Sequence, residues 1–423
     1  MTAPTTTPPG TAPLVRILLP VVAVAFVMFL VTGVALPVLP MYVHGELGFG
    51  TFVVGLVAGA QFSAALVFRF WSGRYADARG PHHATAVGLV LAAVAGLLYL
   101  LSLAVPASPV ASVTVLIVGR GVLGAAESCV VTGALAWGLA LAGSGNAGKV
   151  MSWVGLAMYV ALAVGAPLGT ALYVWSGFRG VALATVVVPV AGLLLVTRAG
   201  PVPSRATSRT GFTRIVRTVW MPGLGLAASS LGFGAITTFI VLLFARAGWA
   251  RGWLGLSIFF STFVIGRLAL GHVPDRAGGA RVALFSALVE ASGLACIWLA
   301  RGPAQAFAGA ALTGVGYALV YPGFGVEAVR RAPAESRGLA MGAYTAFLDL
   351  ALGVGTPVLG HVARFASLGA VFLVSSVVVA SAALIALGLD ARQGVGSQPG
   401  VPAEESGTSK IASRRSEPCR TSS

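Results

Sequence analysis

The sequence is poor in charged residues, and poorest in acids. Asp, Glu, Lys and Arg make up 9% of its 423 residues, and only 12 residues are Asp or Glu. Soluble globular proteins carry about 25% charged residues, so this chain cannot cover a surface that faces water. Hydrophobic residues account for 57% of the sequence. The composition excludes an ordinary soluble domain and predicts a membrane protein.

Cysteine is also scarce. Cys129 and Cys296 fall inside apolar runs, and Cys419 lies close to the C-terminus. Three thiols placed in this way exclude a disulfide framework. We expect them to be inert, and we expect no metal site.

The sequence motifs of common enzymes are missing as well. The chain contains neither the H-E-x-x-H pattern of zinc hydrolases nor the G-x-S-x-G pattern of serine hydrolases. The stretch GSGNAGK ends at Lys149, but Val150 stands where a P-loop needs Ser or Thr to bind magnesium. We therefore expect no enzymatic activity, no cofactor and no ATP-driven transport.

Long apolar runs dominate the sequence instead. Each is about 20 residues long, the length that an α-helix needs to cross the hydrocarbon core of a bilayer. Membrane barrels need alternating hydrophobicity, so continuous runs predict helices. The predicted spans are 17–39, 52–71, 84–105, 110–140, 150–174, 178–197, 219–244, 253–271, 282–300, 304–329, 339–361 and 368–389. We expect an all-α membrane protein with twelve transmembrane helices in two six-helix halves.

Polar stretches divide the chain into five segments. The first and last segments are polar, so we expect them to be disordered. The stretch between the sixth and seventh spans is rich in Pro, Ser and Thr and contains arginines but no acid, which indicates a linker. The predicted segments are a disordered N-terminal tail (1–13), an N-terminal six-helix bundle (14–197), a cytoplasmic linker (198–218), a C-terminal six-helix bundle (219–390) and a disordered C-terminal tail (391–423).

The formal net charge of +15 is distributed unevenly across the predicted membrane. Of the 27 Lys and Arg residues, 21 fall on one side, five fall on the other, and Arg120 lies within a span. An excess of this kind marks the cytoplasmic side, so we expect both termini in the cytoplasm. The basic residues lie singly between apolar runs and form no basic face, which excludes nucleic acid as a partner.

Two stretches of the sequence repeat each other at a fixed distance. RFWSGRYADARG begins at Arg69 and RLALGHVPDRAGG begins at Arg267, 198 positions later. Further on, Met151 to Gly169 matches Met341 to Gly360 with an offset of 190. The chain therefore consists of two similar units in the same order. Duplicated halves of this kind are the layout of many secondary transporters.

The repeated stretch resembles the cytoplasmic loop between helices 2 and 3 of the major facilitator superfamily, G-x-x-x-D-x-x-G. The resemblance covers essentially the whole apolar part of the chain and implies that the two loops latch the halves together on the cytoplasmic side. The loop departs from the family pattern at Ala78, Pro81, His82 and His83, where basic residues are usual. The implied latch residues are Arg69, Gly73, Asp77, Gly80, Arg267, Gly271, Asp275, Arg276 and Gly278.

Charged residues inside the spans are candidates for proton coupling. Arg120 lies in a stretch that resembles the superfamily's helix-4 motif, and Glu127 follows it two turns later on the same helix face. Asp349 lies in the middle of the eleventh span. Charge in hydrocarbon is costly and usually marks a pathway, although an ion pair that holds helices together is the alternative. Glu290, in the ninth span, is expected to face the lipid side and to have a structural role.

Two further groups of residues are singled out by pattern. The fifth span resembles the helix-5 pattern of antiporters, and its repeat lies in the eleventh span; a packing contact is the alternative reading. These residues are Gly165, Pro167, Gly169, Gly355 and Pro357. Polar and aromatic residues within spans are candidates to line a central cavity, and these are Gln61, Tyr159, Thr237, Thr238, Tyr317, Tyr321 and Tyr344.

Within the superfamily, the stretches LPVLPMYVHGELGF, SGRYAD and YTAFLDLALGVGTP are similar to the bacterial YhhS-like efflux subgroup. The resemblance implies a secondary transporter of the bacterial inner membrane that exports small drug-like or sugar-like molecules in exchange for protons. Uptake or facilitated diffusion of a sugar-like solute is the alternative within transport. A membrane sensor that keeps the fold but transports nothing is the alternative from another class.

Overall fold

The computed structural model describes residues 11–105, 107–143, 146–198, 212–333 and 337–396, and all its secondary structure is helical. The sequence marks several helix starts, because Pro81, Pro109 and Pro303 stand at a first helical position, where a missing N–H costs nothing. The helices are α1 (Thr11–Ala35), α2 (Val38–Met41), a π-helical turn (Tyr42–Glu46), α3 (Thr51–Arg79), α4 (Pro81–Leu103), α5 (Pro109–Ala142), α6 (Ala147–Arg198), α7 (Phe212–Arg246), α8 (Trp253–Leu270), α9 (Val273–Ala277), α10 (Gly279–Trp298), α11 (Pro303–Arg331), α12 (Arg337–Phe365) and α13 (Leu368–Gly396).

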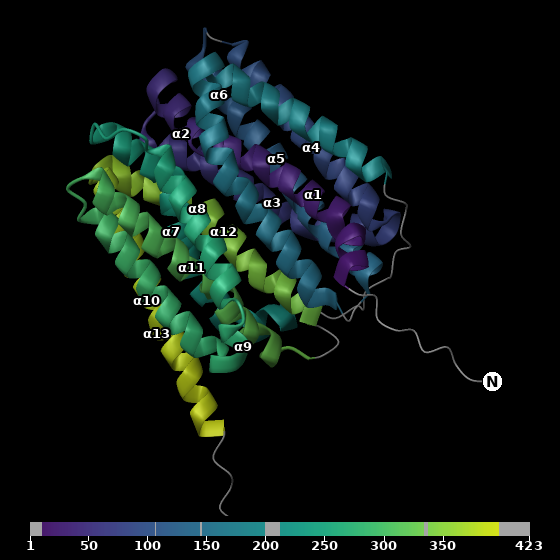
Figure 1. Ribbon diagram of the computed structural model, residues 1–423. Helices are drawn as coiled ribbons and strands as arrows, with labels where there is room; N and C mark the ends of the chain where they lie inside the picture. The colour runs from purple at the N-terminus through teal and green to yellow at the C-terminus, as the bar shows by residue number, and fades with distance from the viewer. Residues whose placement is uncertain (1–10, 106, 144–145, 199–211, 334–336, 397–423) are drawn as a thin grey trace, which may run out of the picture.

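The helices form two bundles that lie side by side (Figure 1), with α1–α6 in one half and α7–α13 in the other. Eleven helices of the described part are long and apolar enough to cross a membrane. The predicted all-α fold with twelve transmembrane helices in two halves is confirmed, because one of these eleven helices accounts for two crossings.

That helix is α6, whose apolar part spans 49 residues. At about 1.5 Å per residue it is more than twice as long as the hydrocarbon core is thick. The backbone leaves helical geometry at Ser176 and Gly177, where Gly177 has φ 62°. Glycine adopts a positive φ without steric cost, so the chain can reverse direction there. The break lies where the sequence predicts the connection between the fifth and sixth spans.

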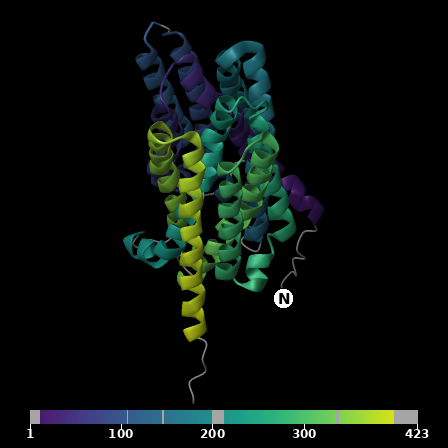
Figure 2. The same ribbon diagram turned by 90° about the vertical axis from the view of Figure 1, so that its left-hand side faces the viewer.

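Helix ends differ from the predicted segment boundaries. Helix α13 runs to Gly396, six residues into the segment predicted as a disordered tail, and Figure 2 shows it extending beyond the other helices. Helix α7 begins at Phe212, inside the predicted linker, and α1 begins at Thr11, inside the predicted N-terminal tail. A helix keeps its own backbone hydrogen bonds in water, so it need not end where hydrophobicity ends. The remainder of the two tails and of the linker lies outside the described residues.

Two long contacts join the halves. Helix α3 packs against α12, and α6 packs against α8; we call these the α3–α12 seam and the α6–α8 seam. Both are closed at the end of the molecule that carries α2, where α3 begins and α12 ends. There, the Thr51 hydroxyl donates to the Gly360 carbonyl (2.8 Å) and the Ser257 hydroxyl donates to the Ala163 carbonyl (3.3 Å). We call this end the α2 end, and the opposite one the terminus end.

Membrane orientation can be tested with single cysteines in a background without the three native ones. Ala107 and Arg251 lie in connections at the α2 end, and Arg331 ends α11 at the terminus end. Because basic residues are concentrated at the terminus end, we expect a membrane-impermeant maleimide to label Ala107→Cys and Arg251→Cys in intact cells. We expect Arg331→Cys to react only after the cells are opened. Labelling of Arg331→Cys from outside would reverse the orientation. Arg205, another informative position, lies outside the described residues.

Candidate functional site

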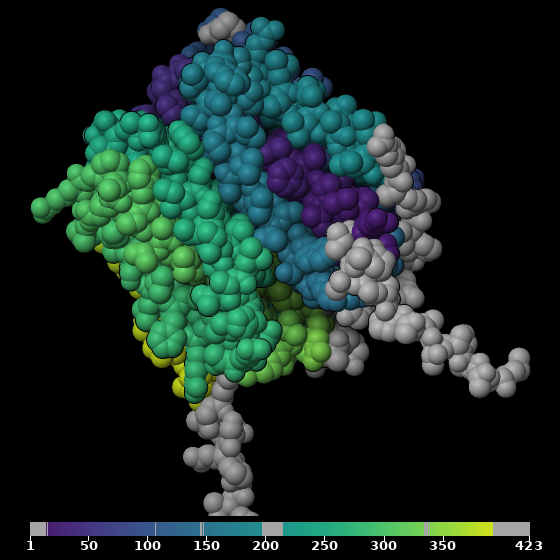
Figure 3. All heavy atoms as spheres, viewed as in Figure 1, coloured from purple at the N-terminus to yellow at the C-terminus, as the bar shows by residue number. Residues whose placement is uncertain are grey.

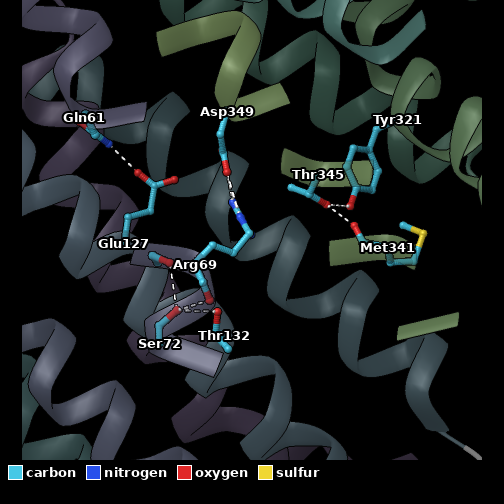
Figure 4. A network of polar contacts seen from close by, with 10 residues as sticks. Gln61, Arg69, Ser72, Glu127, Thr132, Tyr321, Met341, Thr345 and Asp349 are labelled. Atoms are coloured by element: carbon cyan, nitrogen blue, oxygen red, sulfur yellow. Dashed lines mark hydrogen bonds and ion pairs between the residues drawn. The ribbon is translucent and has the colours of Figure 1, made fainter. Parts of the chain in front are cut away.

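An ion pair joins the two halves deep inside the molecule. The guanidinium of Arg69, on α3, donates through Nε to Asp349 Oδ2 on α12 (2.8 Å), and its Nη2 contacts the same oxygen (Figure 4). The Asp349 side chain is 4% exposed and that of Arg69 is 24% exposed. Two other ion pairs, Arg281–Asp390 and Arg330–Glu327, lie within the C-terminal half. The Arg69–Asp349 pair therefore spans the α3–α12 seam.

This pairing changes the reading of two predicted residues. The sequence grouped Arg69 with the cytoplasmic latch loop, but the structure places it inside α3, ten residues before the last residue of that helix, Arg79. For Asp349 the alternatives were a proton carrier or substrate contact and an interhelical ion pair; the structure shows an ion pair, and a role in proton coupling stays a prediction. The signal available in the sequence was that each is a charge next to or inside an apolar span. Their mutual contact, across 280 positions, carries no local signal.

A second carboxylate lies next to this pair. Gln61 on α3 donates through Nε2 to Glu127 on α5 (2.5 Å), and Figure 4 shows both beside Arg69 and Asp349. The two helices approach closely at Gly124, where a Cβ would lie 1.9 Å from the Gln61 carbonyl oxygen. Glu127 interacts electrostatically with Asp349, Arg69 and Arg120. The space thus holds two acids, and Arg69 directly neutralises only one of them.

Arg120 lies on α5 closer to the α2 end and is 2% exposed. Its Nε donates to the Val57 carbonyl oxygen (3.4 Å), whereas its Nη1 is buried without a hydrogen-bond partner among the described residues. Seven residues separate Arg120 from Glu127, which is roughly 10 Å along a helix, and the two do not form an ion pair. Arg120 instead lines a small pocket together with Thr237 and Thr238 of α7.

The residues predicted to form the latch lie at the terminus end, apart from Arg69 and Arg267. Gly73 lies within α3 with open space around it, so the tight turn is made by Gly80 (φ 98°) and, in the repeat, by Gly278 (φ 93°). Gly271 caps α8, and Asp275 and Arg276 lie on α9, which packs against α10 and α11 of its own half. Asp77 is exposed near the end of α3. A latch between the halves therefore stays a prediction.

The residues of the antiporter-like pattern make close helix contacts. A Cβ at Gly165 would lie 2.7 Å from Gly33, and one at Gly169 would lie 1.9 Å from the Val34 carbonyl oxygen, so α6 packs tightly against α1. Pro167 lies between these two glycines, inside α6. In the repeat, Gly355 faces Leu231 of α7, and Pro357 faces Gly55 of α3. Packing is thus shown at both positions, and a hinge role stays a prediction.

The four tyrosines among the predicted cavity residues fall into two groups. Tyr317 and Tyr344 are buried within the C-terminal half, where the Tyr344 hydroxyl donates to the Tyr321 carbonyl oxygen (2.8 Å). Tyr159 and Tyr321 are half-buried at the interface of the halves. The Tyr321 hydroxyl bonds Thr345 (2.9 Å), which sequence reasoning missed and which lies on the helix of Asp349 (Figure 4). These contacts place Tyr321 and Thr345 close to the ion pair.

The two seams differ in chemistry. Tyr159 of α6 stacks on Phe263 of α8 with ring centroids 3.8 Å apart. In the repeat with offset 190, Tyr159 is the counterpart of Asp349, and in the repeat with offset 198, Arg267 is the counterpart of Arg69. Arg267 donates through Nη1 to the Ala318 carbonyl oxygen (3.1 Å) and interacts electrostatically with Tyr159. One seam therefore holds an ion pair where the other holds an aromatic stack.

Two polar clusters were not predicted from the sequence. Ser72 of α3 bonds Ser128 (3.0 Å) and Thr132 (3.4 Å) of α5, beside Arg69 in Figure 4. Glu290 is 0% exposed and accepts a bond from Ser229 of α7, so its predicted lipid-facing position is wrong. A buried carboxylate needs a donor, and α7 supplies one inside the C-terminal half.

Comparison with known proteins shows which family the chain resembles in sequence. The model of the Major Facilitator Superfamily matches residues 21–256 and 223–419. An MFS-type transporter of Salmonella typhimurium is 41% identical over 355 residues, covering 84% of this chain and 91% of the relative. An MFS-type transporter of Pseudomonas aeruginosa is 41% identical over 372 residues, covering 88% and 92%.

Solved structures agree in fold. The nucleoside transporter NupG aligns with a TM-score of 0.71 at 14% identity, covering 88% of this chain and 99% of NupG. The human organic anion transporter MFSD10 aligns with a TM-score of 0.65 at 16% identity, with the same coverage. The YhhS-like subgroup stays a prediction. With a matching family model over most of its length and close bacterial relatives, the chain belongs to the major facilitator superfamily and is a multi-pass membrane transporter.

Proposed function

We propose that this protein is a proton-coupled secondary transporter of the bacterial inner membrane that exports small organic molecules. The Arg69–Asp349 pair carries the proposal, because it joins the two halves at a buried position and has a second acid, Glu127, beside it. Transporters of this layout work by rocking one half against the other around a central site. A charge pair that spans both halves responds directly to such a motion.

The coupling follows from the cost of unpaired buried charge. Removing one partner from a buried ion pair costs about 3–5 kcal/mol, since the other charge is left uncompensated. When the halves separate at this position, Asp349 and Arg69 face that cost. A proton on Asp349 removes its charge and lets Arg69 turn to Glu127, the neighbouring acid. Proton occupancy and the conformation of the transporter thus become linked.

The closed α2 end identifies the state of the transport cycle that the structure represents. With the terminus end in the cytoplasm, as the distribution of basic residues favours, both seams are closed toward the outside. Figure 3 shows a recess between the surfaces of α8 and α6 toward the lower end, with yellow-green atoms deeper inside. In this arrangement a substrate enters from the cytoplasm, and a rocking motion releases it outside.

Transport direction can be tested in energised inverted membrane vesicles. A screen in cells that overproduce the protein first identifies compounds that lose toxicity. Vesicles whose lumen is acidified should then accumulate such a compound if the protein exports it by proton exchange. An uptake system or facilitator for a sugar-like solute would empty preloaded vesicles or equilibrate them. A membrane sensor would do neither, which would overturn the proposal.

Glu127→Gln is expected to lower proton-driven accumulation by roughly tenfold or more, because the amide cannot carry a proton between the two sides. Gln61 can still donate to the new side chain, so folding should be retained. Accumulation in inverted vesicles and the amount of folded protein are measured together. Glu46→Gln, which changes an exposed acid at the α2 end, is the matched control and should behave like the wild type. Unchanged accumulation by Glu127→Gln would remove Glu127 from the coupling.

A further inference from the structure

Arg120 is a buried cation, and the protein uses only part of its hydrogen-bonding capacity. The side chain is 2% exposed, and its contact with the Val57 carbonyl oxygen is long at 3.4 Å. Among the described residues its Nη1 makes no hydrogen bond and no carboxylate forms an ion pair with it, although the Tyr99 hydroxyl and the more distant Glu127 interact with it electrostatically. A guanidinium has five N–H donors in a planar fork that matches a carboxylate. Leaving a buried charge in this state is costly unless a ligand completes it.

The pocket beside Arg120 is built by both halves. Leu39, Val57 and Phe62 line it from the N-terminal half, and Thr237 and Thr238 line it from α7 of the C-terminal half. It lies toward the α2 end, where the seams are closed, and in this conformation it has room for little more than a water molecule, so the body of a ligand enters only when the halves move apart. A ligand here contacts surfaces that move apart when the halves rock, so its affinity differs between the two conformations. Such a difference is what couples binding to a conformational change.

The chemistry of the pocket selects one class of ligand. Apart from Arg120 and the two threonines, its lining is apolar. The Thr237 hydroxyl already donates to the Phe233 carbonyl oxygen (2.8 Å), which leaves few groups for a polyhydroxylated sugar. A cationic ligand would face the Arg120 charge. We propose that this pocket binds the carboxylate group of an organic acid with an apolar body. The Arg120 guanidinium donates hydrogen bonds to that carboxylate. The assignment of such acids as the exported substrate rests on the proposed function.

A purely structural role for Arg120 gives a different expectation. Arg120 could serve to hold α3 against α5 through Val57, with the Tyr99 hydroxyl of α4 close by. Loss of that contact would weaken folding but would not make the protein distinguish a charged ligand from a neutral one. Charge discrimination is therefore the measurement that separates the two roles.

The test compares three carboxylates with their uncharged primary amides: benzoate and benzamide, hexanoate and hexanamide, and cyclohexanecarboxylate and its amide. Full-length protein in lipid nanodiscs, in carboxylate-free buffer, is titrated with each compound, and binding is followed by calorimetry and by the shift in melting temperature. We expect the wild type to bind at least one carboxylate roughly tenfold or more tightly than its amide, as a charge-assisted hydrogen bond predicts. No proton gradient is present, so failure of proton coupling would leave this result unchanged.

Variants then assign the preference to Arg120. Arg120→Gln should lose the preference for the carboxylate, and Arg120→Lys, which keeps the charge, should retain part of it. Arg301→Gln removes an exposed arginine at the α2 end and should bind as the wild type does. If Arg120→Gln fails to fold, the graded response of Arg120→Lys and of Thr238→Val still reports on the pocket. Equal binding of all acids and amides by the wild type, or a preference that persists in Arg120→Gln, would overturn the proposal.

Discussion

Asp349→Asn should reduce proton-driven accumulation to the level of passive equilibration while leaving exchange of substrate down its own gradient. The substitution keeps the size and a hydrogen-bond acceptor for Arg69 but removes the titratable group. It also leaves a charged Arg69 without its buried partner, so the melting temperature should fall. Both accumulation in inverted vesicles and counterflow in the absence of a gradient are measured, because only the first requires a proton to be carried.

A double variant separates the proton from the ion pair. Arg69→Gln with Asp349→Asn removes both charges, and such neutral replacements of a buried pair are often tolerated. If Asp349 carries a proton, the double variant should regain thermal stability and keep counterflow, but it should not regain accumulation. If the pair only holds α3 against α12, accumulation should return together with stability. That second result would exclude Asp349 as a proton carrier.

The exposed pair Arg281–Asp390 supplies the matched control. Its side chains are 67% and 35% exposed, and its two atoms lie 3.3 Å apart. Exposed ion pairs contribute about 0–1 kcal/mol to stability. Asp390→Asn should therefore leave the melting temperature, counterflow and accumulation unchanged.

Gly55→Leu is expected to hold the α2 end open and to stop transport. A Cβ at this position would lie 2.3 Å from the Thr356 carbonyl oxygen and 2.9 Å from the Pro357 Cα atom across the α3–α12 seam. Both are backbone atoms that cannot rotate away, so the closed seam is strained. Overpacking of this kind costs about 1–3 kcal/mol, which changes the balance between two conformations by about 5- to 150-fold.

The shift is measured through the accessibility of a half-buried position. Ala58 lines the pocket behind the closed seam, so Ala58→Cys should react with an external maleimide faster in the Gly55→Leu background than alone. Gly388→Leu adds the same side chain on α13, where nothing lies within 4 Å, and should change neither labelling nor transport. Normal transport by Gly55→Leu, with Ala58→Cys still protected, would show that the seam does not open during the cycle.

The sequence was sufficient for the architecture because hydrophobic length and repetition are local signals. Runs of about 20 apolar residues mark the spans, and the offset of 198 between Arg69 and Arg267 reveals the two halves. Even the break in α6 has a local cause in Gly177. Helix ends were predicted less well, as α13 shows, since a helix can continue into polar sequence.

The site was predicted as a set of residues and not as a set of contacts. Glu127 and Asp349 stood out because charge is rare in a span, but nothing near Gln61 or Arg69 indicates which acid each one meets. Those partners come from the packing of α3 against α5 and α12. Gly55 gave no signal either, since glycine is common in membrane helices, and only the neighbouring backbone of α12 shows why no side chain fits.

The unequal seams also bear on how a duplicated chain differs from a dimer. A symmetric dimer of identical six-helix units makes every contact between its units twice, because the same patch is used on both copies. Here the contact made by Arg69 with Asp349 has Arg267 and Tyr159 as its counterpart. Joining the two units in one chain allowed each copy to change alone. The described part of the fused molecule therefore carries one ion pair between its halves, where a symmetric ancestor would have carried two or none.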